Sequence, residues 1–215
     1  MKSVLVIGLG RFGRHAATQY ANLGCEVMAI DKDEAAINTV VDRVTSTQIG
    51  DCSDIEVLRS LGVNNFDICL VAIGSDFESS MIITVRLKDM GAPMVISMAG
   101  SAIHAQLLVR NGADEVVYPE REMAHYLAVR TTTNNVYDYL ELTPEMGIFE
   151  ISAKEKWRGK TIKELDFRNH YKISILLIKI KDNVFLPDAD YTFNGDEKIM
   201  VMGNREDVSN ATNRM

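Results

Sequence analysis

Three glycines near the start of the sequence have the spacing of a phosphate-binding turn. Gly8, Gly10 and Gly13 lie in the pattern GxGxxG, with Arg11 and Phe12 at two of the variable positions, directly after an apolar run. The first glycine permits a tight turn, the second lets the backbone approach a diphosphate, and the third lets helix and strand pack closely. The free N–H groups at the start of the following helix can then bind phosphate oxygens. The spacing predicts a nucleotide site, and a purely structural turn is the weaker alternative.

An acidic residue at the end of the next apolar run extends this pattern. Asp31 lies where a carboxylate accepts hydrogen bonds from the ribose hydroxyls of a dinucleotide. Lys32 follows it, and no arginine stands beside it to favour a 2′-phosphate. The sequence therefore predicts an adenine nucleotide, either ATP or ADP or NAD(H), with Lys32 included in the predicted site.

Two further loops are expected at the same edge of the sheet. Asp51 and Cys52 follow the third predicted strand and would contact the adenine or ribose side. Ala72, Ile73 and Gly74 follow the fourth, where small residues let a ligand come near. Each loop alone is equally well explained as an ordinary connection between strand and helix. Together with the glycine turn, they outline one crevice at the topological switch point of a parallel sheet.

The elements that must position these residues alternate along residues 1–119. Short β-rich runs predict six strands, at residues 3–7, 26–30, 44–49, 68–73, 94–98 and 115–118, and four of these runs are nearly continuous in apolar residues. Helices are expected to begin near residues 11, 34, 54, 77 and 103, with Asp33 and Ser53 as N-caps. Gly24, Gly62 and Gly112 would end three of them. This alternation predicts an α/β fold, a doubly wound, six-stranded parallel, Rossmann-like domain.

The pattern changes after residue 119. Residues 120–140 are predicted to form a crossover helix with a break or hinge near 131–135, where threonine and asparagine are poor helix formers. Residues 141–215 predict a small α+β domain with strands at 147–153, 172–180, 184–186 and 198–202 and a helix at 162–165. The run at 173–178 is apolar on both faces, so it either meets a second copy of the chain or is buried within one chain.

Composition narrows the class of protein. Hydrophobic residues make up 47% and charged residues 25%, and no apolar run reaches the roughly 18 residues needed to span a bilayer. The net charge of −7 argues against binding to nucleic acid or insertion at an anionic membrane. Cys25, Cys52 and Cys69 lack metal-ligand spacing and predict reduced thiols. We expect a cytoplasmic protein without a signal peptide.

Residues for catalysis are harder to find. A dehydrogenase needs an acid, a base or a metal facing the nicotinamide. No Tyr-x-x-x-Lys pair occurs, and the four histidines are scattered without ligand spacing. An NAD-dependent oxidoreductase is therefore an alternative without support from a second site, and the chain is predicted not to be an enzyme.

These motifs together resemble one family. The glycine turn, Asp31, the segments at 50–51 and 71–74, Gly-Ala-Asp at 112–114 and the run at 119–124, which begins Pro-Glu, resemble the regulator-of-potassium-conductance (RCK) family. Within it, the chain is similar to the Ktr/Trk potassium-uptake regulatory subunits. The resemblance covers nearly the whole chain.

The resemblance implies a non-enzymatic gating subunit. Members of the family form dimers and then rings, commonly octameric, beneath a membrane-embedded potassium channel or transporter, and are peripheral to the inner face of the membrane. Exchange of ATP for ADP, or binding of NAD(H), changes the ring shape. Carried over by position, Arg11 would reach the terminal phosphate of a nucleotide in the adjacent subunit. Glu120 would help to place a divalent or sodium cation there.

The resemblance also assigns the remaining contacts. The three glycines and Arg11 would line the phosphates, Asp31 would bind the ribose, Asp51 and Cys52 the base, and Ala72 and Ile73 would form the crevice wall. Met98 stands where many relatives carry a basic residue.

The C-terminal part resembles domains that bind cyclic di-AMP between two copies. Ile162, Arg168 and Pro187 lie where such a pocket would form. A stand-alone second-messenger binding protein is therefore a second alternative.

Overall fold

The computed structural model describes residues 1–133 and 135–213 and forms two compact units, Met1–Arg121 and Glu122–Met215. The division falls inside helix α6 (Pro119–Thr132), whereas the sequence placed the domain boundaries after residues 119 and 140. In the part of the chain that is described, no helix is long and apolar enough to cross a membrane.

The N-terminal unit is a six-stranded parallel sheet with the strand order β3-β2-β1-β4-β5-β6. This confirms the predicted doubly wound fold. The direction of winding reverses between β1 and β4, which defines the switch point. Its elements are β1 (Ser3–Ile7), α1 (Arg11–Asn22), β2 (Glu26–Asp31), α2 (Glu34–Asn38), β3 (Ser46–Ile49), α3 (Ile55–Leu61), the 3-10 turn Val63–Asn65, β4 (Ile68–Val71), α4 (Phe77–Asp89), β5 (Val95–Met98), α5 (Ala102–Arg110) and β6 (Glu115–Val117).

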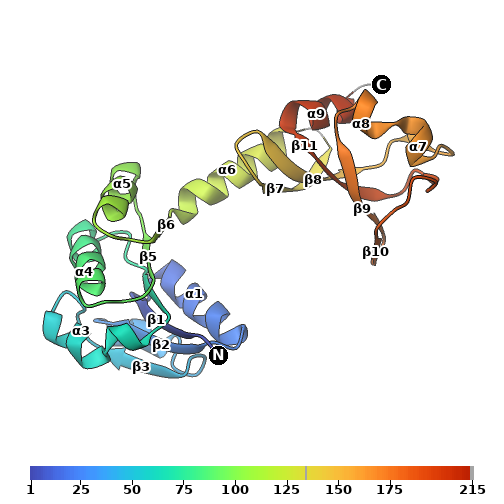
Figure 1. Cartoon of the computed structure of the whole chain (residues 1–215). Helices are drawn as coiled ribbons and strands as arrows, with labels where there is room; N and C mark the ends of the chain where they lie inside the picture. The colour runs from blue at the N-terminus through green and yellow to red at the C-terminus, as the bar shows by residue number, and fades with distance from the viewer. Residues whose placement is uncertain (134, 214–215) are drawn as a thin grey trace. The chain divides into compact units, whose positions relative to one another are not determined.

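Helices cover both faces of this sheet, which is why the inner strands β1, β4 and β5 are almost wholly buried and mostly apolar. The edge strand β3 is more polar and is exposed or half-buried. Successive residues of β1 point to opposite faces. Val4 and Val6 belong to a core shared with Ala17 of α1. Leu5 and Ile7 belong to a second core with residues of α3 and α4. Figure 1 shows α1 on one side of the sheet and α3 and α4 on the other.

Local capping residues set where the helices begin. Asp33 caps α2 as predicted, because its carboxylate accepts a hydrogen bond from the N–H of Ala35. The prediction that Ser53 caps α3 is wrong. Asp54 does so by accepting from the N–H of Glu56, while the hydroxyl of Ser53 is buried without a partner among the described residues.

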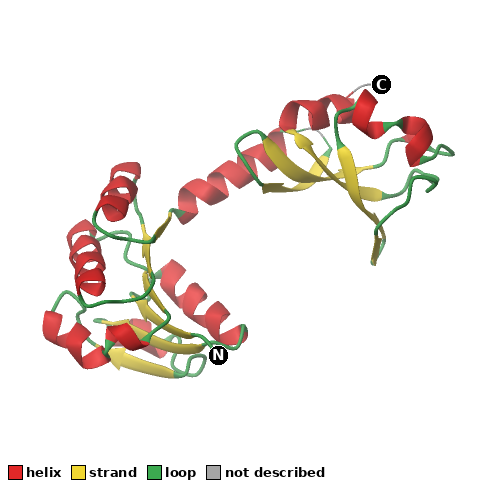
Figure 2. Cartoon of the chain, viewed as in Figure 1, coloured by secondary structure: helices red, strands yellow, loops and turns green. Residues whose placement is uncertain are grey.

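The C-terminal unit is built on a five-stranded antiparallel sheet in the order β10-β9-β11-β8-β7 (Figure 2). This agrees with the predicted small α+β domain. Its elements are β7 (Val136–Glu141), β8 (Met146–Ser152), the 3-10 turn Glu155–Trp157, α7 (Ile162–Leu165), α8 (Phe167–His170), β9 (Ser174–Ile180), β10 (Asn183–Phe185), β11 (Lys198–Asn204) and α9 (Arg205–Asn213).

Three of these elements were not predicted. The first is strand β7, which lies where the sequence predicted that the crossover helix would continue to residue 140. Helix α6 instead ends at Thr132, near the expected break. Helix α9 carries only a narrow apolar stripe, of which Val208 and Ala211 are fully buried. Helix α8 is four residues long and joined to α7 through Asp166. Short or polar segments such as these are stabilised by tertiary packing rather than by propensity.

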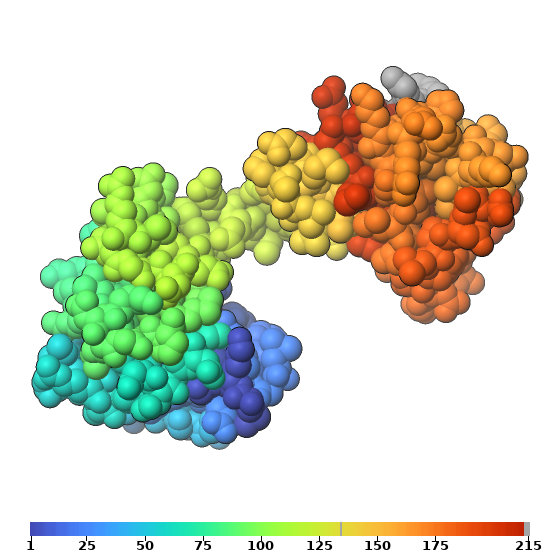
Figure 3. All heavy atoms as spheres, viewed as in Figure 1, coloured from blue at the N-terminus to red at the C-terminus, as the bar shows by residue number. Residues whose placement is uncertain are grey.

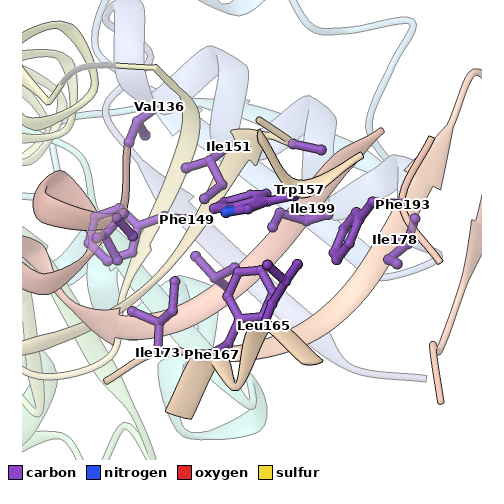
Figure 4. Close-up of a cluster of buried hydrophobic side chains, with 14 of the residues drawn as sticks. Val136, Phe149, Ile151, Trp157, Leu165, Phe167, Ile173, Ile178, Phe193 and Ile199 are labelled. Atoms are coloured by element: carbon purple, nitrogen blue, oxygen red, sulfur yellow. The ribbon is translucent and has the colours of Figure 1, made fainter. Parts of the chain in front are cut away.

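Aromatic side chains fill the C-terminal core. Trp157 is fully buried and packs edge-on against Phe167, with ring centroids 4.9 Å apart (Figure 4). Phe149 and Phe193 belong to the same core. In β9, Ile178 is buried, whereas Leu176 and Leu177 are half-buried. The strand is therefore partly covered by its own chain, and its partner surface stays a prediction.

Candidate nucleotide-binding site

The glycine turn connects β1 to α1 in a conformation that requires its first glycine. Gly8 has φ +91°, and its N–H donates to the carbonyl of Ile30, with N and O 2.9 Å apart. A Cβ at this position would lie 2.8 Å from Cγ1 of Ile73. Any side chain here would be strained both by the backbone and by its neighbour.

The other two glycines serve different purposes. A Cβ on Gly13 would lie 1.9 Å from the carbonyl oxygen of Gly8 and 3.0 Å from Cβ of Ala72, so α1 packs directly on the turn. A Cβ on Gly10 would meet nothing within 4 Å. Gly10 is also exposed and is the N-cap of α1, without a side-chain hydrogen bond. Of the three positions, only this one leaves open space above the backbone, as approach of a diphosphate requires.

Asp31 is connected to this turn by hydrogen bonds. Its Oδ2 accepts from the N–H of Leu9 at 2.6 Å, and its Oδ1 accepts from the N–H of Asp33 at 2.9 Å. The carboxylate therefore orders the glycine turn, a role that the sequence did not reveal. Each oxygen keeps lone-pair capacity for another donor, such as a ribose hydroxyl.

Of the two residues predicted to bind nucleotide in the loop after β3, only Asp51 has an exposed side chain. Asp51 is exposed and accepts from the N–H of Ser53 at 2.8 Å. Cys52 is only 3% exposed and belongs to the core beneath the sheet. Burial, and secondarily the nearby carboxylates of Asp51 and Asp31, raises the pKa of the Cys52 thiol to about 12. The thiol is thus an inert core group, and any contact from this residue would come from its backbone.

The loop after β4 packs closely against the loop after β5. The N–H of Ala72 donates to the carbonyl of Ile7 at 2.8 Å, which aligns the two strand ends. A Cβ on Gly74 would lie 2.9 Å from Cε of Met98, so this side chain reaches over the loop. A Cβ on Gly100 would lie 2.2 Å from the carbonyl oxygen of Gly74. Gly100 was missed from the sequence, although its Ala-Gly-Ser turn carries the same small-residue signal.

A buried histidine supports this second loop. His104 is 2% exposed; its Nδ1 accepts from the N–H of Gly100, and its Nε2 lies 3.2 Å from Oγ of Ser80. Because Nδ1 is an acceptor, the ring is neutral here. Burial lowers the pKa of His104. Nothing in the sequence distinguished it from the other histidines.

Three further residues of the predicted site, Arg11, Phe12 and Lys32, differ in exposure. Arg11 is exposed at the first position of α1, and Phe12 is half-buried against the core of that face. Lys32 is exposed and close enough to Asp76 to help lower the pKa of that carboxyl, after the larger effect of hydrogen bonds from Ser79. Asp76 is the N-cap of α4.

The predicted cation site has only one ligand residue, Glu120. Glu120 is exposed in the first turn of α6. Within residues 1–133 and 135–213, no group of three or more His, Cys, Asp or Glu residues could hold a metal ion. Glu120 would therefore need ligands from a nucleotide or another subunit. In the Gly-Ala-Asp segment, Asp114 has a structural role, since it pairs with Lys88 and accepts from the N–H of Val95.

The predicted second ligand site lies in the other unit. The N–H of Ile162 donates to the carbonyl of Tyr191, and Lys163 likewise to Ala189, so α7 lies beside the segment that follows Pro187. Arg168 is exposed on α8. Binding of cyclic di-AMP stays a prediction.

The fold and the turn together define a Rossmann-like nucleotide-binding domain followed by a small β-rich domain. Two family models match accordingly, the TrkA-N domain over residues 4–119 and the TrkA-C domain over residues 146–215. Ktr system potassium uptake protein C of Bacillus subtilis (strain 168) is 38% identical over 215 residues, 100% of this chain and 97% of that protein. Ktr system potassium uptake protein A of the same organism is 32% identical over 213 residues, 99% of this chain and 96% of that protein.

The chain belongs to the Ktr/Trk family of potassium-uptake proteins, built from TrkA-N and TrkA-C domains. This confirms the resemblance seen in the sequence. The family is one of non-enzymatic regulatory subunits, so the oxidoreductase alternative is set aside.

Solved structures share the fold at low identity. The GsuK RCK domain has a TM-score of 0.68 at 16% identity, and the match covers 97% of this chain and 46% of that one. The GsuK channel bound to NAD has a TM-score of 0.67 at 17% identity, over 96% of this chain and 38% of that one. A structure of GsuK bound to ADP matches 63% of this chain and 36% of that one, with a TM-score of 0.54 at 17% identity.

Proposed function

We propose that this chain is a nucleotide-sensing gating subunit of a Ktr-type potassium-uptake system. An adenine nucleotide binds at the carboxyl edge of the N-terminal sheet, and its identity changes the shape of a homo-oligomeric assembly. The assembly lies at the inner face of the membrane, where a membrane-embedded potassium channel or transporter responds to its shape. Relatives named as Ktr potassium uptake proteins, 38% and 32% identical over almost the full chain, support the potassium-uptake part.

The observation that carries nucleotide binding is the open backbone above Gly10. The turn is rigid on either side of it, because Gly8 and Gly13 are packed against neighbouring atoms. Asp31 holds the N–H of Leu9 and retains acceptor capacity for a ribose. A preformed turn of this kind binds phosphate without the cost of ordering a loop.

Self-association is supported by exposed apolar residues of the C-terminal unit. The hairpin of β7 and β8, yellow in Figure 3, is at the surface of its unit. Leu140 and Leu142 are 58% and 50% exposed there, and Met123 and Leu127 of α6 are 62% and 49% exposed. Large apolar side chains that are exposed in this number are typical of protein interfaces. We propose a dimer that assembles further into an octameric ring.

A single methyl group tests the nucleotide site. Gly10→Ala adds a side chain that meets no protein atom within 4 Å, so the free energy of unfolding should fall by no more than about 1 kcal/mol, the usual cost of alanine at an N-cap. The same methyl group occupies the space of the diphosphate, and affinity for ATP, ADP and NADH should fall at least about tenfold by calorimetry. Undiminished affinity in this variant would refute the proposed site.

A further inference from the structure

A second pocket lies in the N-terminal unit, outside the nucleotide crevice. It has a volume of about 250 Å³ and lies between α1 and the turn that follows α2. Its lining residues are Arg14, His15, Thr18, Thr39, Val40 and Arg43. None of them belongs to the predicted nucleotide site.

Backbone hydrogen bonds and core packing hold the lining in place. The N–H of Arg43 donates to the carbonyl of Val40 at 2.8 Å, which closes a tight turn after α2. Val40 is 1% exposed and shares a core with Ala17 of α1, so the turn is anchored against that helix. Arg14 and Thr18 are four residues apart and therefore lie on one face of α1. The two arginines thus come from different elements of one packed region.

The pocket gathers positive charge on a chain whose net charge is −7. Arg14 and Arg43 are both exposed. Throughout residues 1–133 and 135–213, neither guanidinium has a carboxylate within salt-bridge distance or a hydrogen-bond acceptor. Two uncompensated guanidinium groups and an imidazole around one concavity attract an anion.

The geometry favours phosphate among anions. Guanidinium groups bind phosphate oxygens in pairs. The volume lies just below the roughly 300 Å³ at which pockets for larger organic ligands begin, so a small ligand fits. Both threonine hydroxyls already donate to backbone carbonyls, Thr18 to Arg14 at 2.9 Å and Thr39 to Ala36 at 2.7 Å. Each therefore offers only acceptor lone pairs, which suit an anion that carries its own O–H.

We propose that this pocket binds hydrogen phosphate, either free or as a small phosphate monoester with a neighbouring hydroxyl. The two arginines bind the charged oxygens, and the threonine oxygens accept the ligand's O–H. The site is separate from the nucleotide crevice and does not depend on its proposed function.

Calorimetry at constant ionic strength tests this, with inorganic phosphate, sulfate and glycerol phosphate as separate ligands of the intact chain. Wild type should bind phosphate more tightly than sulfate, which has no proton to donate at neutral pH. If glycerol phosphate binds as tightly as inorganic phosphate, the natural ligand is a phosphate monoester. If it binds more weakly, the natural ligand is the free ion. Arg14→Gln and Arg43→Gln should each weaken phosphate binding about tenfold, the usual effect of losing a hydrogen bond to a charged group.

Two matched variants sharpen the result. Arg110→Gln removes an exposed arginine of α5 and should leave phosphate affinity unchanged. Thr18→Val keeps the shape of the side chain and should reduce the preference for phosphate over sulfate.

Three results would overturn the proposal. In the first, wild type binds phosphate no better than chloride or sulfate. In the second, phosphate binding persists in both Arg14→Gln and Arg43→Gln, as binding at the glycine turn would. In the third, affinity falls equally in Arg110→Gln, as a general charge effect would.

Discussion

At the scale of single residues, Asp31 orders the glycine turn and is the residue that we propose for ribose binding. Asp31→Ala removes the acceptor for the N–H groups of Leu9 and Asp33 as well as the proposed ribose contact. We expect the free energy of unfolding without ligand to fall by about 2 kcal/mol, and affinity for adenine nucleotides by roughly another 2 kcal/mol. Denaturant unfolding and calorimetry measure the two effects.

Asp42→Ala is the matched control, since this exposed carboxylate lies outside the site and should change neither quantity. Unchanged affinity of Asp31→Ala for ATP, ADP and NADH would show that Asp31 orders the turn but does not bind the ribose.

His104 predicts a pH dependence of stability. Burial lowers the pKa of this histidine in the folded chain, so the unfolded chain takes up a proton at higher pH. Its contribution to stability is therefore fully present above about pH 6.5 and is lost as the pH falls from there toward the lowered folded pKa. His104→Gln should flatten the change in unfolding free energy between about pH 7 and pH 5.

The control is His15→Gln in phosphate-free buffer, because His15 is exposed and should leave the slope intact. Asp76 and Asp114 have lowered pKa values and so titrate below this window. An equal slope in wild type and His104→Gln would contradict the assignment.

The sequence predicted the residues of the glycine turn because their constraints are local. The tight turn, the start of the helix and the acidic residue at the end of the next strand each depend on a few neighbouring residues, so the sequence shows them directly. The burial of Cys52, the support of Gly100 by His104 and the second role of Asp31 depend on neighbours distant in sequence, so no local pattern revealed them.

At the scale of elements, the contact between α1 and the turn should be intolerant of any side chain. Gly13→Ala would place a Cβ 1.9 Å from the carbonyl oxygen of Gly8. Because this oxygen belongs to the backbone of the turn, it cannot move away as a flexible side chain would. We expect a loss of unfolding free energy of about 3 kcal/mol, at the upper end of ordinary overpacking. Nucleotide affinity should fall with it. Chemical denaturation compared with Gly10→Ala checks this, and equal stability of the two variants would contradict the described packing.

Elements were predictable where apolar periodicity was strong. All six parallel strands were expected from β-rich runs, four of which are nearly continuous in apolar residues, as is typical of strands buried on both faces. In contrast, β7 follows a helix and has only Val136 buried and Tyr139 half-buried among exposed residues, and α9 is mostly polar. Their structures are fixed by pairing with β8 and by packing on the sheet, which no segment shows by itself.

At the scale of the whole molecule, we propose that the identity of the bound nucleotide selects between two assemblies. A ligand shifts such an equilibrium only by its differential affinity for the two states. We expect ADP to need only the turn, the helix N-terminus and Asp31 of one subunit. The third phosphate of ATP adds charge that an arginine of an adjacent subunit can bind bidentately. Arg11 is exposed at the start of α1 and is the residue we propose for this contact, with Glu120 helping to place a cation.

Small-angle X-ray scattering of wild type, Arg11→Ala and the control Arg110→Ala, each with ATP and with ADP, tests this claim most directly. We predict that wild type and Arg110→Ala give different scattering curves with the two nucleotides, at masses well above 24.0 kDa. Arg11→Ala should give one curve with both, while its ADP affinity by calorimetry stays within about threefold of wild type. A variant that still distinguishes ATP from ADP as wild type does, or a wild-type curve that is the same with both nucleotides, would contradict the proposed gating role.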